Sequence, residues 1–145
     1  MSESLDELQM VEEAKKPENP ETAGTVEKNR ILIIDDNRDL ATSLARLLRL
    51  VGYEVEAVFD GREGIELART YRPRVVLLDI GLPNFDGYQV ARGLRQAGLQ
   101  DTVIIAVSGY GLEEDQRRSR EAGMDYHVTK PVDVKTIAEL IGKPA

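Results

Sequence analysis

The sequence predicts an α/β domain whose core is a doubly wound, parallel five-stranded sheet of the flavodoxin-like type. Two observations support this fold class. Short apolar segments alternate five times with segments of helical periodicity, which is the pattern of repeated βα units. Three of the apolar segments are unbroken, namely residues 31–34, 75–78 and 103–107, as is typical of strands buried on both faces. We therefore expect these three strands in the centre of the sheet.

Two further segments have the character of edge strands. Residues 53–58 alternate between apolar and polar side chains, and residues 125–129 are short and partly polar. Alternation of this kind is typical of a strand with one face toward water. With the second and fifth strands at the edges, the sheet can take the order 2-1-3-4-5, and the switch point of the winding then lies between the first and third strands.

The first two helices are predicted from capping residues and apolar spacing. The first begins after Asn37, a suitable N-cap, and ends before Gly52. Its larger apolar residues follow the spacing of one helix face and are expected to point toward the sheet: Leu40, Leu44, Leu47, Leu48 and Val51. The second helix is expected over residues 61–71.

The last three helices differ in how firmly their sequences anchor them. The helix expected over residues 86–97 starts with a capping box formed by Asp86 and Gln89. The helix expected over residues 134–141 follows an aspartate cap. Between them, the helix expected over residues 112–122 is weakly amphipathic and dominated by charged side chains. We expect this helix to be loosely packed and therefore suited to switching.

Composition excludes several classes of protein. The 145 residues are enough for one domain, and the absence of Cys excludes disulfide frameworks, zinc fingers and thiol nucleophiles. The only histidine, His127, makes a His-rich metal site implausible. A net charge of −7 without a basic patch predicts no nucleic-acid binding. Because the sequence has neither an apolar run of ~18 residues nor a secretory signal, we expect a cytoplasmic protein without a membrane partner.

Residues 1–29 differ from the rest of the chain. They are rich in charged residues, with an acidic excess, and contain few bulky apolar residues. We expect a flexible acidic tail, and the capping box at Ser4 also allows a short docking or dimerisation helix over about residues 5–16. The domain itself is expected over residues 30–145, with no output domain after its last helix.

Polar side chains gather at the carboxyl ends of four predicted strands: Asp35, Asp36, Asp79, Ser108 and Lys130. In doubly wound sheets the functional crevice lies at this edge. Three carboxylates in one crevice repel one another, and a divalent cation removes that conflict. A donor set of oxygen atoms, with room for water, suits Mg²⁺ better than zinc or calcium.

The same cluster is suited to phosphoryl transfer. A carboxylate flanked by Mg²⁺, the Lys130 ammonium and the Ser108 hydroxyl can receive a phosphoryl group, because the cations balance the charge on the equatorial oxygens. A Ca²⁺-binding loop of the EF-hand type is excluded, since Leu40 replaces its glycine and Arg46 its last glutamate. The second aspartate of haloacid-dehalogenase-type phosphatases is also missing, because Gly81 stands at its position.

The strand ends form a set of recognisable motifs: Ile33-Ile34-Asp35-Asp36-Asn37, Leu78-Asp79-Ile80-Gly81-Leu82-Pro83, Asp86-Gly87, Val107-Ser108-Gly109 and Thr129-Lys130-Pro131. From about residue 30 to residue 142, the chain resembles a receiver domain of a two-component response regulator. Asp36, Asp79, Ser108 and Lys130 are separated by 43, 29 and 22 residues, intervals that suit this family. The segment 109–133 is most similar to receivers carried by hybrid histidine kinases.

The resemblance implies a Mg²⁺ site. Asp36 and Asp79 would bind the ion directly, together with the backbone carbonyl of Gly81 and water molecules. Asp35 would act mainly through a bound water. Gly81 and Tyr110 also lie at positions where the family tunes the rate of dephosphorylation.

The resemblance also implies roles in phosphoryl transfer and switching. Asp79 would be the phosphoacceptor, Ser108 would hydrogen-bond the phosphoryl group, and Lys130 would pair with it. His127 occupies the position of the family's aromatic switch residue, where Tyr or Phe is more usual. The switching step is therefore less well defined by the sequence than the phosphorylation step.

The expected function is that of a stand-alone phosphoacceptor in two-component or phosphorelay signalling. A histidine kinase or a histidine phosphotransfer protein would donate the phosphoryl group, and phosphorylation would switch the binding of a downstream protein to the face formed by residues 112–141. Such a protein catalyses only its own phosphorylation and dephosphorylation. Two alternatives stay open: a receiver-like interaction module that acts without phosphorylation, and a phosphatase that turns over exogenous substrates.

Overall fold

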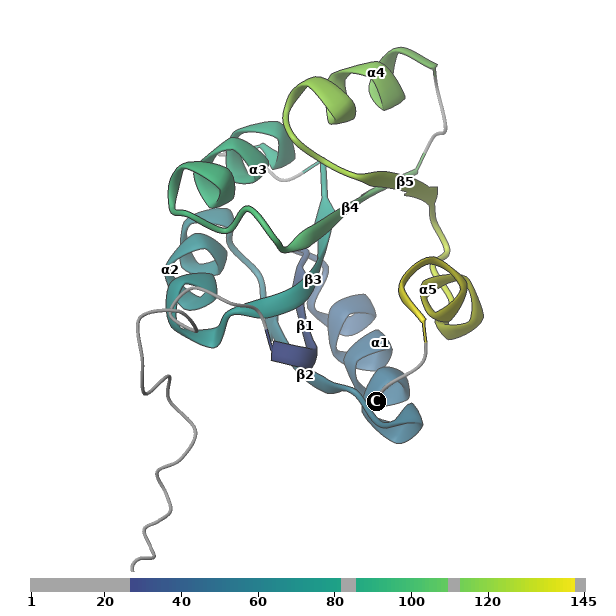
Figure 1. The fold of residues 1–145 in the computed structure, drawn as a ribbon. Helices are drawn as coiled ribbons and strands as arrows, with labels where there is room; N and C mark the ends of the chain where they lie inside the picture. The colour runs from purple at the N-terminus through teal and green to yellow at the C-terminus, as the bar shows by residue number, and fades with distance from the viewer. Residues whose placement is uncertain (1–26, 82–85, 110–112, 143–145) are drawn as a thin grey trace, which may run out of the picture.

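The computed structural model describes residues 27–81, 86–109 and 113–142. Five parallel strands form one sheet in the order β2-β1-β3-β4-β5 (Figure 1). The strands are β1 (Glu27–Ile34), β2 (Glu54–Val58), β3 (Pro73–Asp79), β4 (Val103–Ser108) and β5 (Tyr126–Thr129). The helices are α1 (Arg38–Val51), α2 (Gly61–Tyr71), α3 (Gly87–Gln96), α4 (Glu113–Glu121) and α5 (Val134–Ile141). The predicted fold class and strand order are confirmed.

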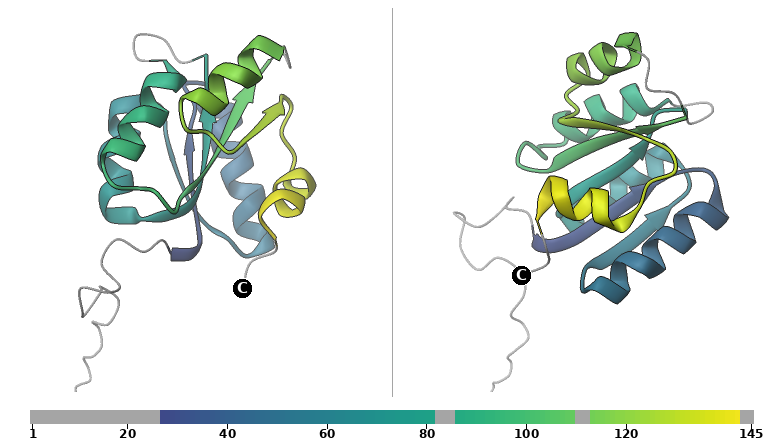
Figure 2. Two further views of the ribbon diagram at one scale, coloured as in Figure 1. Left: turned by 45° about the horizontal axis from the view of Figure 1, so that its top comes forward. Right: turned by 90° about the vertical axis from the view of Figure 1, so that its right-hand side faces the viewer.

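Helices cover both faces of the sheet, which explains the unbroken apolar runs of the central strands. Leu32 and Ile34 of β1 point into the core beneath α2 and α3, whereas Ile31 and Ile33 point into the core beneath α1 and α5. The two pairs of helices lie on opposite sides of the strands in Figure 1, and Figure 2 shows α4 on the same side as α3. Among the described residues, no helix is long and apolar enough to cross a membrane.

Two strands begin earlier than the apolar runs predict. β1 starts at Glu27, three residues before the expected start of the domain, and pairs there with Pro73 of β3. β3 starts at Pro73, two residues before its apolar run, and the first position of a strand tolerates the missing N–H of proline. Both extensions pair with each other through backbone groups, and the pattern of apolar side chains does not predict such pairing. Residues 1–26, including the predicted tail helix, lie outside the described residues.

The predicted core-facing side of α1 is wrong for most of its residues. The side chains buried against the sheet are those of Ala41, Ala45 and Leu48. Leu40 and Leu47 are each 51 % exposed, Val51 is 46 % exposed and the neighbouring Leu50 is 78 % exposed. Leu48 is buried as predicted and Leu44 is half-buried against the same core, while the small side chains of Ala41 and Ala45 take the remaining core positions. The result is an apolar surface on α1, formed by Leu40, Leu47, Leu50 and Val51.

α3 starts in close contact with the end of β3. Asp86 and Gln89 form the predicted capping box, in which each side chain accepts a hydrogen bond from the other's backbone N–H at 3.0 Å. Gly87 follows, and a Cβ at this position would lie 2.4 Å from the Cα of Ile80 and 2.8 Å from the backbone oxygen of Asp79. Glycine is required here because the helix packs directly against the chain that positions Asp79.

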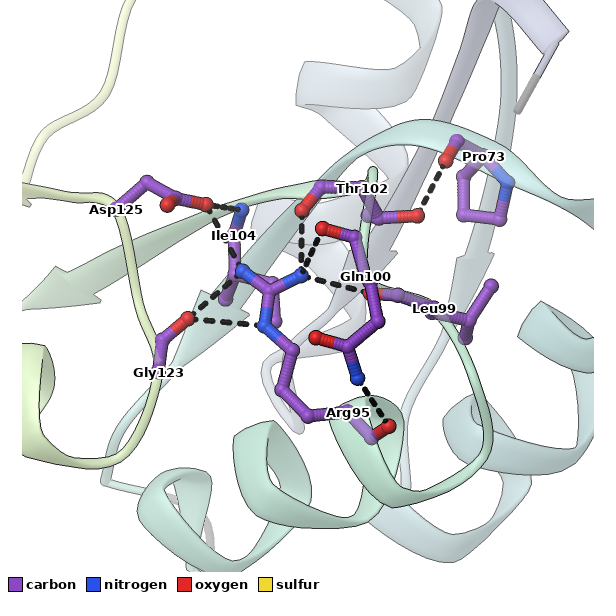
Figure 3. Close-up of polar contacts among 8 residues, drawn as sticks. All are labelled: Pro73, Arg95, Leu99, Gln100, Thr102, Ile104, Gly123 and Asp125. Carbon is purple, nitrogen blue, oxygen red and sulfur yellow. Dashed lines mark hydrogen bonds and ion pairs between the residues drawn. The ribbon is translucent and has the colours of Figure 1, made fainter. Parts of the chain in front are cut away.

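The amino-end edge of the sheet contains a polar cluster that the sequence did not reveal. The Arg95 guanidinium at the end of α3 donates to the carbonyls of Leu99 and Thr102, both at 2.7 Å, and to the carbonyl of Gly123 at 2.7 and 3.1 Å (Figure 3). It also pairs with the carboxylate of Asp125 at 2.9 Å. One side chain thus joins α3, the start of β4 and the connection between α4 and β5.

Candidate functional site

The carboxyl ends of four strands bring the predicted residues to one edge of the sheet. Asp35 follows β1, Asp79 ends β3, Ser108 ends β4 and Lys130 follows β5. The carboxylates of Asp35, Asp36 and Asp79 lie close enough that one oxygen of each is within 4.8 Å of the others. Lys130 Nζ lies 3.7 Å from Asp35 Oδ2 and 3.6 Å from Asp79 Oδ2. The predicted acidic cluster and its lysine are therefore adjacent.

The two buried carboxylates are held in the same way. Asp35 Oδ1 accepts a hydrogen bond from the backbone N–H of Asn37, and Asp79 Oδ1 accepts one from the backbone N–H of Gly81, both at 2.9 Å. In each case the other oxygen, Oδ2, is the one nearer to Lys130. Each aspartate thus has one oxygen fixed by the chain two residues further on and one turned toward the cationic side of the cluster.

Negative charge exceeds positive charge in this cluster. Asp35 and Asp79 are buried, while Asp36 is exposed. Burial raises the pKa of Asp35 above its ordinary value of 3.8, and the negative charge of Asp79 raises it further. The N–H of Asn37 and the Lys130 ammonium act in the opposite direction without cancelling the effect. One ammonium facing three carboxylates leaves a site that favours an additional cation.

The donor set fits a hard divalent cation. Carboxylate oxygens from Asp35, Asp36 and Asp79 converge from two neighbouring strand ends, and Asp36 is open to water. Oxygen donors with incomplete protein coordination match the preference of Mg²⁺, which keeps several water ligands. Gly81 is exposed beside the cluster, and its backbone N–H is engaged with Asp79. The role of its carbonyl as a fourth ligand stays a prediction.

Ser108 lies in a row of hydrogen-bonding groups that runs away from the acidic cluster. Its hydroxyl is 2.7 Å from Nε2 of His127 on β5, and Nδ1 of His127 is 3.4 Å from the hydroxyl of Ser119 on α4. The carbonyl of Ser108 also accepts the N–H of Lys130 at 2.7 Å. Sequence reasoning singled out Ser108 and His127 but missed Ser119, because a serine among the charged residues of α4 gives no signal of burial.

An apolar cavity of about 280 Å³ adjoins the acidic cluster. Asp35, Asp79 and Lys130 contribute to one part of its wall. The rest is apolar and comes mainly from α1, the central strands and the connection between β5 and α5, including Leu40, Leu44, Leu77, Val107, Pro131 and Val132. Leu40, one of the exposed leucines of α1, therefore borders the site. Because the leucines of α1 were predicted to face the sheet, the sequence did not predict this apolar surface.

Tyr110, the other residue predicted to tune the rate of dephosphorylation, lies outside the described residues.

A doubly wound sheet with an aspartate cluster and a lysine at its carboxyl edge defines a class of α/β proteins with an acidic pocket at the topological switch point. The family model described as the response regulator receiver domain matches residues 31–142. The chain belongs to this family, as the sequence motifs predict.

Known relatives support the same assignment. The transcriptional regulatory protein PrrA of Mycobacterium leprae is 36 % identical over 118 residues, which cover 81 % of this chain and 49 % of that protein. The polar-differentiation response regulator DivK of Brucella anthropi is 34 % identical over 113 residues, which cover 77 % of this chain and 91 % of DivK. The chain therefore spans about half the length of PrrA and most of the length of DivK.

A solved structure shows the same architecture. It is a response regulator protein from Burkholderia pseudomallei, described as containing a phosphorylated aspartic acid, a calcium ion and citrate. The likeness has a TM-score of 0.73 and 27 % identity and covers 78 % of this chain and 66 % of the other.

Proposed function

We propose that this protein is a phosphoacceptor receiver, in which Asp79 takes a phosphoryl group from a phosphohistidine and the phosphorylated form changes its binding to a downstream protein. The observation that carries this proposal is the position of Asp79. Its carboxylate lies at the centre of the carboxyl edge, 3.6 Å from the Lys130 ammonium and within 4.8 Å of two further carboxylates.

The chemistry follows from these contacts. A carboxylate oxygen of Asp79 forms a bond to phosphorus while the bond between phosphorus and the donor's imidazole nitrogen breaks, and the electron pair leaves with the imidazole. Lys130 balances charge on the phosphoryl oxygens, and Ser108 supplies a hydroxyl donor at the end of the neighbouring strand. Mg²⁺, held by Asp36 and Asp79 with Asp35 nearby, would supply further positive charge to the same oxygens. Hydrolysis by water would later return Asp79 to its free form.

Similarity to known proteins supports this chemistry without identifying partners. The Burkholderia pseudomallei relative contains a phosphorylated aspartic acid, and DivK is a response regulator of nearly the same length as the matched region. We propose a histidine kinase or a histidine phosphotransfer protein as the donor, acting in the cytoplasm. The protein would act as an enzyme only on its own phosphorylation and dephosphorylation.

The donor is proposed to dock over α1 and the adjoining cavity. Leu40 and Leu47 expose apolar surface on this helix, and Leu40 also lines the cavity that reaches Asp79. Exposed apolar patches of this kind mark interaction sites. A docked protein would place its histidine at the carboxyl edge of the sheet, whereas the downstream partner is proposed to use the α4, β5 and α5 side.

The test is phosphate incorporation by Asp79→Asn and by a matched control, Asp101→Asn, which alters an exposed aspartate just before the amino end of β4. With a small phosphodonor and Mg²⁺, the wild type and the control should form a hydroxylamine-sensitive acyl phosphate, and Asp79→Asn should form none. Undiminished incorporation by Asp79→Asn would contradict the assignment.

Two other outcomes would favour the alternatives. Absence of incorporation in the wild type, with partner binding retained, would favour an interaction module that acts without phosphorylation. Sustained turnover of added phosphate esters would favour a phosphatase.

A further inference from the structure

Most of the apolar surface of α1 lies at the end of the helix that is far from the acidic cluster. Leu47, Leu50 and Val51 are 51 %, 78 % and 46 % exposed and follow one another in the last two turns of α1. Their spacing of three and four residues places them side by side on the helix. Adjacent exposed side chains of this size mark an interaction site rather than ordinary surface.

The described chain begins close to this surface. α1 joins the carboxyl end of β1 to the amino end of β2, so it ends at the amino-end edge of the sheet, where β1 begins (Figures 1 and 2). Arg30, three residues after Glu27, pairs with Glu54, which is three residues after Val51. The chain therefore limits the distance between the Cα atoms of Glu27 and Val51 to about 27 Å.

Positive charge gathers at the same end of the molecule. The last turns of α1 and α2 and the first residues of β1 and β3 meet there, and together with Glu27 and Glu54 they carry six arginines: Arg30, Arg46, Arg49, Arg69, Arg72 and Arg74. Arg46 is exposed and lies one turn before Leu50 on α1. An apolar stripe bordered by positive charge is complementary to a segment that combines apolar and acidic side chains.

The sequence before β1 has this complementary pattern. Its 26 residues contain seven acidic residues and two lysines, which give a net charge of −5. Leu5, Leu8 and Val11 recur every three residues, as on one side of a helix, and Ser4 and Glu7 have the spacing of a capping box. A helix formed here would present a narrow apolar stripe among carboxylates.

We propose that residues 4–16 dock as an amphipathic helix on the apolar surface at the end of α1 in the same molecule. The stripe of the segment packs on Leu47, Leu50 and Val51, and its carboxylates lie near Arg46. The ten residues from 17 to 26 span up to about 33 Å, which exceeds the distance that they must bridge. Because the connection is short, the segment faces α1 at a millimolar effective concentration, so a contact that is weak between separate molecules is enough.

The docked segment would also control access to α1. It covers Leu47, which belongs to the face proposed for the phosphohistidine donor, so the segment and the donor protein exclude each other there. A small phosphodonor needs no such face and would react equally well in both states. This consequence rests on the proposed function, whereas the contact between the segment and α1 does not.

The absence of cysteine makes a direct test practical, because Gln9→Cys gives a single position for a nitroxide in the middle of the segment. In the full chain labelled with ¹⁵N, relaxation enhancement by the nitroxide is measured on the backbone amides, with the reduced label as reference. We expect strong enhancement at Leu47, Leu50 and Val51, and little on α3, which covers the other face of the sheet. Enhancement of α1 no greater than that of α3 would overturn the proposal.

A mixed sample separates the segment's own α1 from that of a second copy. The ¹⁵N-labelled chain without nitroxide is mixed with unlabelled chain that carries the nitroxide. We expect the enhancement on α1 to disappear, because the contact is intramolecular. Enhancement retained in the mixture would make a second copy the occupant and would overturn the proposal.

Four substitutions in the Gln9→Cys chain test which side chains hold the contact. Leu8→Gln and Leu50→Gln should each lower the ratio of docked to undocked segment about fivefold, since each removes a partly buried leucine from the contact. Arg46→Gln should lower it about twofold, as expected for one exposed charge pair. Arg92→Gln, at an exposed position of α3, is the matched control and should leave it unchanged.

Undiminished enhancement in both leucine variants would overturn the proposal, and so would an equal loss in Arg46→Gln and Arg92→Gln. Leu50 is mostly exposed and Leu8 precedes the first strand, so neither variant removes a side chain from the core. All of these samples contain neither phosphodonor nor Mg²⁺. A negative result therefore rejects the docked segment and leaves the phosphoacceptor proposal standing.

Discussion

Two polar clusters lie at opposite edges of the same sheet, and they differ in how well their charges are matched. At the amino edge, the Arg95 guanidinium directs all of its nitrogens to backbone carbonyls and to the Asp125 carboxylate, with several contacts at 2.7 Å. At the carboxyl edge, three carboxylates face the single ammonium of Lys130, whose closest contacts to them are 3.6 and 3.7 Å. In the first cluster every guanidinium nitrogen has a partner, whereas the second cluster has an excess of negative charge.

This difference separates a structural cluster from a functional one. A charged group with matched partners holds segments together and gains nothing from a ligand. A cluster with unbalanced charge makes the folded protein less stable, and a bound cation or a phosphorylated state with its cation relieves that cost. Polarity alone therefore does not identify a site in this fold, whereas uncompensated charge does.

The largest effect is expected from breaking the amino-edge cluster. Arg95→Met should lower the free energy of unfolding by about 3 kcal/mol, because it leaves several inward-facing carbonyls and Asp125 without their donor. Arg95→Lys is the matched control: it keeps the charge and loses the planar fork, so it should recover only part of the stability. Urea denaturation measures both variants.

The same variants should leave phosphorylation unaffected when it is counted per folded molecule. Loss of incorporation in the folded fraction of Arg95→Met would show that the two edges are coupled. If Arg95→Met lowers the free energy of unfolding by less than about 0.5 kcal/mol, the range of ordinary surface substitutions, water replaces the guanidinium as the hydrogen-bond donor to these carbonyls.

The sequence revealed the two clusters unequally, for a physical reason. The acidic residues stand at the ends of apolar strands, and parallel topology carries all such ends to one edge, so their proximity could be predicted. The partners of Arg95 are mostly backbone carbonyls, which every residue has, and so no pattern of side chains indicates them.

The orientation of α1 was missed for a related reason. The buried alanines and the exposed leucines share helical spacing, and only packing against the sheet decides between them.

The next largest effect is expected from a cation at the carboxyl edge. Mg²⁺ at about ten times its dissociation constant should raise the free energy of unfolding by about 1.4 kcal/mol, since binding to the folded state alone contributes RT ln(1 + [L]/Kd). Asp36→Asn should reduce this gain by weakening binding, whereas Arg95→Lys should keep it in full. Thermal unfolding with and without a chelator makes the comparison, and an undiminished Mg²⁺ effect in Asp36→Asn would place the ion elsewhere.

A smaller effect is expected from removing one charge of the acidic cluster. In a chelator at pH 7, Asp35→Asn should stabilise the protein by about 1 kcal/mol, because burial and the charge of Asp79 raise the pKa of Asp35 in the folded state. At a pH between its ordinary pKa and its raised pKa, the folded state holds a proton that the unfolded state has lost. The contribution of Asp35 to stability therefore falls as pH rises from about its ordinary value of 3.8 to above its raised pKa.

The measurement is the difference in unfolding free energy between the wild type and Asp35→Asn from pH 3 to pH 7. The difference should be small at the acidic end and favour the variant increasingly toward pH 7. Asp101→Asn should show no such trend. If Asp35→Asn is the less stable protein at pH 7, the hydrogen bond from Asn37 and the ion pair with Lys130 outweigh the cost of burial.

The smallest effect is expected where a charge pair is exposed. Arg30 lies 3.2 Å from the carboxylate of Glu54, whose side chain is 59 % exposed. The same guanidinium also donates to the carbonyl of Tyr71 at 2.8 Å and lies 5.1 Å from the centroid of the Tyr71 ring. Glu54→Gln should therefore change the free energy of unfolding by less than about 0.5 kcal/mol, because water screens the pair and Arg30 keeps its other partners. Urea denaturation at low and high salt tests this, and a loss of more than 1 kcal/mol would mean that matched charges stabilise this sheet edge even when they are exposed.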